Sequence, residues 1–326
     1  MKYKKMGRTG LKVSEICLGT MTFGEQVNEA ESIRIVKTAI ADGINFIDTA
    51  DSYVDGRTEE IVGKALKGER NAVVLATKVG AWQSGPAIND AGLSRKHIMR
   101  EVEDSLRRLG TDYIDVYYAH KPDYSTPMEE TLRAFDDLVR QGKVRYIACS
   151  NYRAFQLGEA LWLSDVRNLA RFDCIQTPYN LLTRDVEYEL LALCASQGVG
   201  VTIYNPLAAG LLTGKHDGTA PPPAGGRFTT KRLGNMYFTR YWTDKNFEAV
   251  AQLKKVAEGH NHKLPQFSLA WILNNPAVTS VISGVTSLEQ LKDNEAASDV
   301  QLTKEELTAC DELWQKLVPS RFLYGR

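Results

Sequence analysis

The chain has 326 residues, of which 43% are apolar and 25% charged, the composition of an ordinary soluble globular protein. Forty basic residues balance forty acidic ones, which excludes the strongly basic surface of a protein that binds nucleic acid or an anionic membrane. No stretch approaches the roughly 18 to 20 apolar residues of a membrane-spanning helix, and the charged segment 1–7 lacks the apolar core of a signal peptide. We therefore expect a cytoplasmic protein, and the sequence leaves its oligomeric state open.

The first predicted element is a hairpin over residues 1–13, where two glycines separate two short β-like runs and the hairpin would close the floor of the fold. Short apolar segments then alternate with longer amphipathic ones. The predicted strands, rich in Val, Ile, Tyr or Leu as buried strands are, span 16–19, 45–48, 73–78, 114–120, 144–150, 174–178, 199–205 and 278–283. The predicted helices span 29–42, 58–66, 94–109, 127–141, 155–163, 186–197, 247–259 and 287–297.

Capping residues support this alternation. Plausible N-caps open four of the helices, namely Thr58, Ser94, Thr126 followed by Pro127, and Ser287. Glycines that suit a left-handed C-cap follow five of them, namely Gly43, Gly68, Gly110, Gly142 and Gly198. Eight β and eight α units in alternation predict a parallel sheet closed into a (β/α)₈ TIM barrel, one domain over residues 1–326. An open doubly wound sheet is the alternative.

Two segments fall outside the repeat. The connection 208–244 is long, contains three consecutive prolines, and is predicted to be a structureless active-site loop at the carboxyl end of the strands. Residues 304–326 are predicted to form an extra C-terminal helix, over 304–317, and a tail. Five scattered cysteines without paired spacing are expected to be free buried thiols in a reducing compartment.

Polar residues follow three neighbouring strands of the predicted barrel: Asp48, Lys78 and His120. Because catalytic groups in barrels come from the carboxyl ends of strands, these three side chains can converge, with Tyr53 reaching them from a loop. A lysine that ends an apolar strand is costly to bury alone, and Asp48 is its natural counter-ion. A buried ion pair without catalytic function is the alternative.

Tyr53 makes the catalytic interpretation stronger. A tyrosine has a pKa of about 10, but an ammonium about 4 Å away at an effective dielectric constant of about 20 supplies roughly 4 kcal/mol. That interaction is large enough to make Tyr53 a usable general acid. His120 beside such a pair is interpreted as the donor that polarises a carbonyl oxygen, although a core imidazole is the alternative.

Four fragments in order carry a family resemblance. Residues 43–50 with Tyr53 match the pattern G-x-x-x-x-D-T-A-x-x-Y, and residues 106–123 match L-x-x-L-x-x-x-Y-x-D-x-x-x-x-H-x-P-D. With the segments 142–151 and 176–180, they make nearly the whole chain resemble the aldo-keto reductase superfamily, nearest its bacterial and potassium-channel β-subunit branch.

The resemblance implies that Tyr53 is the proton donor, that Lys78 lowers its pKa, that Asp48 pairs with Lys78, and that His120 orients the carbonyl. Channel β subunits typically lack this histidine, so His120 is typical of the ordinary reductases.

The resemblance also implies an extended nicotinamide cofactor bound without a Rossmann glycine fingerprint. The implied contact residues are Gly19, Thr20, Met21, Asp48, Ser150, Asn151, Gln176, Tyr204, Asn205, Pro206, Leu207, Ala208, Gly210, Leu211, Lys215, Arg227, Gly284, Thr286, Gln290, Asp293 and Asn294. Among them, Tyr204 would stack on the nicotinamide and the run from Asn205 would bring N–H groups to the pyrophosphate. Thr286 stands where many members carry Arg or Lys, and Arg227 could supply that charge. NADPH (the reduced form of NADP) is favoured, and NAD is possible.

The expected substrate is a small carbonyl compound or the corresponding alcohol. The predicted pocket residues, mostly aromatic, are Phe23, Tyr53, Trp82, His120, Tyr237 and Trp242, although some of the aromatics could instead anchor the long loop. Three other functions stay open: a Schiff-base lyase acting through Lys78, a nucleotide-sensing regulatory subunit with low turnover, and a sugar dehydrogenase or epimerase. No metal site is expected, because His97, His216, His260 and His262 show no carboxylate or cysteine at ligand spacing.

Overall fold

The computed structural model of the chain describes residues 1–81, 84–230 and 234–318. The chain divides into two compact units. The barrel unit comprises Met1–Pro178, Val186–Tyr204 and Pro276–Glu295, and the helical unit comprises Tyr179–Asp185, Asn205–Asn275 and Ala296–Arg326. That the chain is one domain stays a prediction.

Eight parallel strands of the barrel unit close into a barrel, so the predicted (β/α)₈ class is confirmed. In spatial order they are β10 (Ser280–Gly284), β3 (Ile16–Gly19), β4 (Phe46–Asp48), β5 (Val74–Val79), β6 (Ile114–Ala119), β7 (Val144–Ser150), β8 (Phe172–Pro178) and β9 (Gly200–Tyr204). The predicted strands agree to within two residues at each end. The prediction for β8 began two residues late, because Asp173 interrupts its apolar run and hides Phe172.

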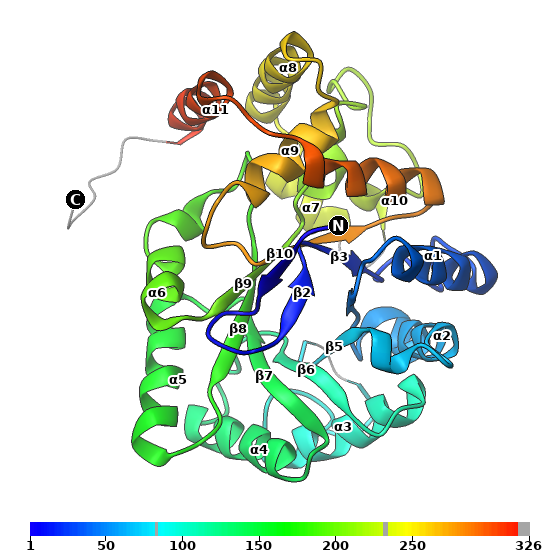
Figure 1. Ribbon diagram of the computed structural model, residues 1–326, viewed down its shortest axis with the longest axis vertical. Helices are drawn as coiled ribbons and strands as arrows, with labels where there is room; N and C mark the ends of the chain where they lie inside the picture. Colours follow the sequence, from blue (N-terminus) through cyan, green and yellow to red (C-terminus); the bar gives the residue numbers. More distant parts are fainter. Residues whose placement is uncertain (82–83, 231–233, 319–326) are drawn as a thin grey trace. The chain divides into compact units, whose positions relative to one another are not determined.

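Helices of the barrel unit pack around the outside of this barrel (Figure 1). Those of the barrel unit are α1 (Glu29–Ala41), α2 (Arg57–Ala65), α3 (Arg95–Leu109), α4 (Met128–Arg140), α5 (Ala154–Arg167), α6 (Leu190–Gln197) and α10 (Leu288–Glu295), with the short 3₁₀ helices η1 (Tyr53–Gly56) and η2 (Arg70–Ala72). Another short helix, η3 (Asp185–Glu187), spans a sequence boundary between the units.

The capping predictions have mixed outcomes. Ser94 caps α3 as expected, since its hydroxyl accepts from the His97 amide. Thr58 is not a cap: Gly56 takes that position, and the Thr58 hydroxyl donates to the Phe23 carbonyl. Thr126 does not cap α4 either, because its hydroxyl binds Asp123.

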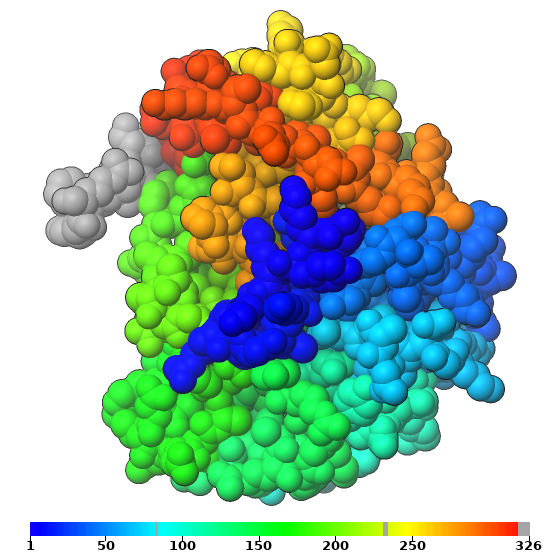
Figure 2. Space-filling view, in the orientation of Figure 1, coloured from blue at the N-terminus to red at the C-terminus, as the bar shows by residue number. Residues whose placement is uncertain are grey.

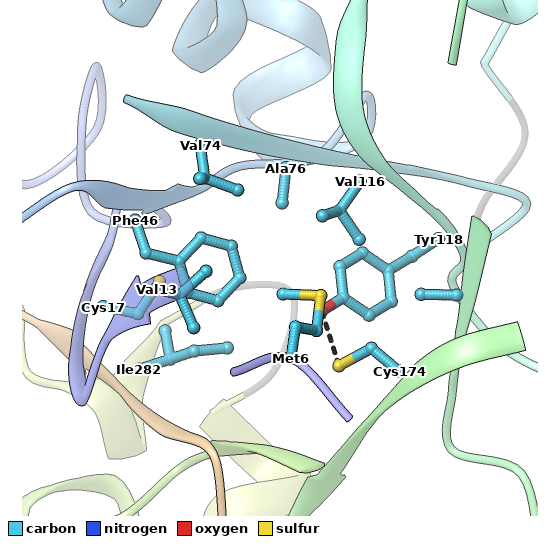
Figure 3. Close-up of a cluster of buried hydrophobic side chains, with 11 residues drawn as sticks. Met6, Val13, Cys17, Phe46, Val74, Ala76, Val116, Tyr118, Cys174 and Ile282 are labelled. Carbon is cyan, nitrogen blue, oxygen red and sulfur yellow. Dashed lines mark hydrogen bonds between the residues drawn. The ribbon is translucent and has the colours of Figure 1, made fainter. Parts of the chain in front are cut away.

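The N-terminal hairpin is present, with β1 (Tyr3–Lys5) antiparallel to β2 (Lys12–Ser14), and it lies across the face viewed in Figure 2. Gly7 has a φ of 55°, and a Cβ there would lie 2.4 Å from the Gly198 carbonyl oxygen, so only glycine allows this approach. Met6 and Val13 enter the cluster of buried side chains inside the barrel (Figure 3). The hairpin therefore supplies part of the barrel core.

The helical unit contains the elements η4 (Ala208–Thr213), η5 (Arg227–Thr229), α7 (Gly234–Tyr241), α8 (Asp244–Gly259), α9 (Leu264–Leu273), η6 (Ala296–Asp299) and α11 (Lys304–Leu317). The prediction of a structureless 208–244 segment is therefore wrong, because η4, η5 and α7 lie within it. Helix α9 escaped prediction because seven of its ten residues are buried, which leaves no amphipathic period to detect.

The C-terminal helix has its predicted bounds, and the tail beyond residue 318 lies outside the described residues. All five cysteines are free and buried, as expected. Within the part of the chain that the structure describes, no helix has both the length and the apolar character needed to cross a membrane.

Candidate active site

Three adjacent strands of the barrel bring the predicted catalytic side chains to one edge. Strand β4 ends at Asp48, Lys78 lies next to the end of β5, and His120 directly follows β6. The register pairs Asp48 with Ala76 and Lys78 with Tyr118, so the carboxyl ends of these strands lie side by side. Tyr53 begins η1, four residues after Thr49 on the segment that leaves β4.

The ammonium of Lys78 is fully buried and uses all three of its donors. Its Nζ lies 2.6 Å from Oδ1 of Asp48, 2.7 Å from the carbonyl oxygen of Thr49 and 3.2 Å from the hydroxyl oxygen of Tyr53. The ion pair expected between Lys78 and Asp48 is therefore present. The Thr49 carbonyl was not predicted, because backbone acceptors leave no signature in a sequence.

Two opposing influences determine the charge of Lys78. Burial lowers the pKa of its ammonium, but the Asp48 carboxylate and Tyr53 outweigh burial and hold that pKa above its usual value. The lysine is therefore a fixed cation at neutral pH. A Schiff-base lyase needs a neutral amine, so this geometry counts against that alternative.

The second oxygen of Asp48 is also bound. Nε2 of Gln176, from β8, donates to Oδ2 of Asp48 at 2.9 Å. The backbone carbonyl of Asp48 in turn accepts from both the amide and the hydroxyl of Thr20. Asp48 thus links β3, β4, β5 and β8, and Gln176 positions this carboxylate in addition to any contact with a cofactor.

His120 lies beside Tyr53, with ring centroids 6.1 Å apart and planes at 77°. Its Nδ1 is buried without a hydrogen-bond partner in the described structure. Burial first, and then the nearby ammonium groups of Lys78 and Lys121, lower the pKa of His120 well below its usual value. The ring is therefore neutral at pH 7 and carries a single N–H donor.

The segment that holds Tyr53 has an uncommon backbone. Val54 and Asp55 have φ angles of 49° and 52°, in the left-handed region, which a β-branched residue such as Val54 rarely adopts. Such a conformation costs on the order of 1–3 kcal/mol for each residue and persists where surrounding structure enforces it. Nothing in the residue pattern predicted this turn, which directly follows Tyr53.

Next to His120, three of the predicted nicotinamide contacts form a hydrogen-bonded group. Asn151, with a φ of 64°, donates through Nδ2 to the His120 carbonyl at 2.9 Å and to Oγ of Ser150 at 3.0 Å. The hydroxyl of Tyr204 donates to Oδ1 of Asn151 at 2.7 Å. The structure thus brings Ser150, Asn151 and Tyr204 together at the carboxyl ends of β7 and β9.

The remaining predicted cofactor contacts of the barrel unit lie around the end of β10, and those from Gly284 onward were predicted to meet the adenosine side. Gly19 pairs with Gly284 in the sheet, and Met21 follows two residues after Gly19. The amide and hydroxyl of Thr286 both donate to Oε1 of Gln290. On the same helix, Asp293 precedes Asn294, whose amide donates to Ser283. These contacts are compatible with a binding role, which stays a prediction.

The other predicted cofactor residues lie in the helical unit, in a strained turn that includes Pro206 and Leu207. Asn205, Ala208 and Ala209 have φ angles of 56°, 49° and 58°. The amides of Ala208, Ala209 and Gly210 already donate within this turn, to Asn205 or Leu207. A pyrophosphate would therefore have to share or displace these contacts. Leu211 is buried, Lys215 is exposed and Arg227 begins η5.

The structure describes only some of the residues predicted to line the substrate pocket. Trp82 lies outside the described residues, and Phe23 is fully buried. In the helical unit, Tyr237 is buried, and the Trp242 ring centroid lies 4.8 Å from that of Phe228 and 5.1 Å from that of Phe247. Trp242 therefore anchors this segment internally, as the alternative interpretation held. Its contact with substrate stays a prediction.

The barrel, with a buried ammonium held between a carboxylate and a tyrosine at its carboxyl edge, defines a class: (β/α)₈ barrels with a buried Tyr–Lys–Asp group. Residues 15–315 match the model of the aldo/keto reductase family. The chain belongs to this family, and membership supports an NAD(P)H-dependent oxidoreductase.

Similar proteins carry two kinds of name. The chain is 40% identical over 305 residues to a "probable voltage-gated potassium channel subunit beta" of Arabidopsis thaliana, covering 92% of each chain. It is 38% identical over 323 residues to a "putative voltage-gated potassium channel subunit beta" of Schizosaccharomyces pombe, covering 95% of this chain and 92% of the relative. It is 39% identical over 324 residues to the "uncharacterized oxidoreductase YrpG" of Bacillus subtilis, covering 96% of each.

Proposed function

We propose that the chain reduces the carbonyl group of a small aldehyde or ketone to an alcohol with NADPH, using Tyr53 as the proton donor. The observation that carries the proposal is the Lys78 ammonium, whose three donors are all bound, one of them to the Tyr53 hydroxyl. A cation fixed at this distance stabilises the phenolate that remains after proton donation. We propose that the reaction takes place in the cytoplasm.

Each member of the group has a separate task. The carbonyl oxygen accepts a hydrogen bond from the neutral His120 ring and the proton from Tyr53, while Lys78 compensates the charge left on the phenolate. Asp48, bound through both carboxylate oxygens, keeps the Lys78 ammonium protonated and in place. Such general acid catalysis is worth about 10²- to 10⁴-fold in rate.

The chemistry of the donor groups fits a nicotinamide. Its carboxamide needs both a donor and an acceptor, and Ser150 and Asn151 supply both beside His120. Tyr204, hydrogen-bonded to Asn151, offers a ring for stacking. When bound, the nicotinamide supplies the hydride, which with the Tyr53 proton balances the conversion of a carbonyl to an alcohol.

The proposed preference for NADPH over NADH depends on cationic side chains that could meet the extra phosphate. Arg227 and Lys215 are the cationic residues of the helical unit proposed to meet a phosphate, whereas Thr286 offers no charge. NADH use therefore remains the competing outcome of a cofactor comparison.

A second candidate function is a nucleotide-binding regulatory subunit with little turnover. The identity of 38–40% to relatives named as potassium channel β subunits favours it. His120, which lies against Tyr53, favours the enzyme instead.

The test is Tyr53→Phe, assayed for NADPH oxidation across a panel of aldehydes and ketones. The proposal predicts a loss of turnover of about 10²- to 10⁴-fold with cofactor affinity nearly unchanged. Near-native turnover in Tyr53→Phe would refute the assignment of the proton donor. Tight cofactor binding by the wild type without turnover on any carbonyl would favour the regulatory function.

A further inference from the structure

The barrel unit contains a second buried group of polar side chains, formed by Asp51, His97 and Glu101. Asp51 lies on the segment between β4 and Tyr53, and His97 and Glu101 lie one turn apart on α3. One potential ligand atom from each residue lies within 4.8 Å of those of the other two. The interpretation that His97 lacks carboxylate neighbours is therefore wrong. The signal was present, since His97 and Glu101 have the i, i+4 spacing of one helix face.

These side chains are deeply buried and incompletely bonded. Asp51, His97 and Glu101 are 5%, 0% and 2% exposed. Within the described structure, both ring nitrogens of His97 and Oδ1 of Asp51 have no hydrogen-bond partner. A buried polar atom without a partner costs about 1–3 kcal/mol, and native proteins leave few of them. Three such atoms in one place indicate a ligand.

The charges around the group favour a cation. Arg108 donates through Nε to Glu59 at 2.6 Å and through Nη2 to Glu101 at 2.7 Å. One inner guanidinium therefore faces three buried carboxylates, those of Asp51, Glu59 and Glu101. The more exposed Arg100 contacts Glu101 only at 3.9 Å and is paired with Asp90.

The chemistry of the ligand atoms indicates which cation the group would bind. Both ring nitrogens of His97 lack a hydrogen-bond partner in the described structure, so one of them can offer a lone pair to a metal ion. One imidazole nitrogen with two carboxylates suits zinc and similar first-row ions, whereas Mg²⁺ and Ca²⁺ prefer oxygen alone. Arg108 would orient Glu101 from behind, as groups that hydrogen-bond to metal ligands do.

We propose that Asp51, His97 and Glu101 form a binding site for one divalent transition-metal ion of the zinc type. Ligands of a tetrahedral zinc ion lie about 3.4 Å apart, so side-chain adjustments of about 1 Å close the site. The bound ion ties α3 to the segment that carries Tyr53. Its role is structural, because Lys78 and Asp48 complete the catalytic group without it.

The experiment uses the full-length protein, stripped with a chelator and titrated with Zn²⁺ or Co²⁺, with Mg²⁺ as the control ion. One equivalent of Co²⁺ should produce a visible absorption band, and saturating Zn²⁺ should raise the Tm by a few degrees. Mg²⁺ at the same concentration should leave the Tm unchanged.

Two variants test the ligands. His97→Gln and the isosteric Asp51→Asn should each weaken Zn²⁺ binding by 10-fold or more, whereas the control His216→Gln, in the helical unit, should bind like the wild type. The proposal is overturned if the stripped wild type binds no stoichiometric Zn²⁺ or Co²⁺. It is equally overturned if Asp51→Asn keeps the wild-type affinity and absorption band. If His97→Gln fails to fold, Asp51→Asn decides alone.

Discussion

Two buried ionisable groups of the barrel unit, one around Lys78 and one around His97, are built in opposite ways. Around Lys78, one ammonium meets one carboxylate, and every donor of the ammonium is bound. Around His97, one inner guanidinium meets three carboxylates, and ring nitrogens have no partner among the described residues. The first group holds its charges fixed, while the second can take up a proton or a cation.

The pKa directions follow this difference. Around Lys78, the neighbours outweigh burial and stabilise the charged form of the lysine. In the other group, burial raises the pKa of Asp51 well above its usual range, and Glu59 and Glu101 raise it further. Burial also raises the pKa of Glu59, against the opposing influence of Arg108. Balanced charges therefore mark the site proposed to manage a proton in catalysis, and unbalanced charges mark the site proposed to bind a ligand.

The largest effect on stability is expected from Lys78→Met. This change leaves Asp48 buried without its counter-ion and should cost about 3–5 kcal/mol in the free energy of unfolding, measured by urea denaturation. It should also reduce carbonyl turnover strongly while leaving a residual activity that can be measured. Lys64→Met, which removes a half-exposed lysine from a surface ion pair, is the matched control and should cost less than about 1 kcal/mol. Equal losses in the two variants would contradict the claim that burial makes the Lys78–Asp48 pair costly to break.

Arg108→Leu should cost less, about 2–3 kcal/mol at pH 7, because the carboxylates it leaves can take up protons. The sign of its pH dependence follows from the raised pKa of Glu59. A carboxyl whose folded pKa is raised adds stability below its unfolded pKa and loses it as the pH rises through the folded value. The variant should therefore be least stable at high pH, and unfolding curves at pH 5 and pH 8 check this. A larger loss at pH 5 would contradict it.

The smallest effect is expected from Asp51→Asn in the metal-free protein. The pKa of Asp51 is raised in the folded protein, so the wild type loses stability as the pH rises through this folded pKa. Asparagine does not ionise, so the variant has no such loss. The variant should gain on the order of 1 kcal/mol at pH 8 and close to nothing at pH 4. Thermal unfolding at the two pH values measures the difference, and a loss at pH 8 would show that Asp51 is ionised in a favourable pair.

The sequence predicted the barrel and the members of the Lys78 group because both leave regular signals. Apolar strands recur at a steady spacing, and Asp48, Lys78 and His120 stand directly at strand ends. Helix α9 and the elements inside 208–244 lacked such signals, since α9 is apolar on nearly all sides and the others are short.

Other parts of the site depend on three-dimensional contacts. The hydrogen bond from the side-chain amide of Gln176 to the carboxylate of Asp48 joins residues 128 positions apart. The left-handed turn at Val54 leaves no signature in the local residue pattern. The group around His97 combines a helix face with a distant loop residue, so the spacing could reveal only two of its three members, His97 and Glu101.

The central claim is that the Lys78 ammonium, restrained by Asp48, controls the proton of Tyr53. The most direct test is the apparent pKa of the basic limb of kcat/KM against pH, measured in the wild type, Lys78→Met and Asp48→Asn. Residual activity in Lys78→Met should show this limb shifted upward, because the cation is gone. In Asp48→Asn it should shift downward, because the cation is no longer offset. Shifts of opposite sign support the account, and an unchanged limb in both variants would contradict it.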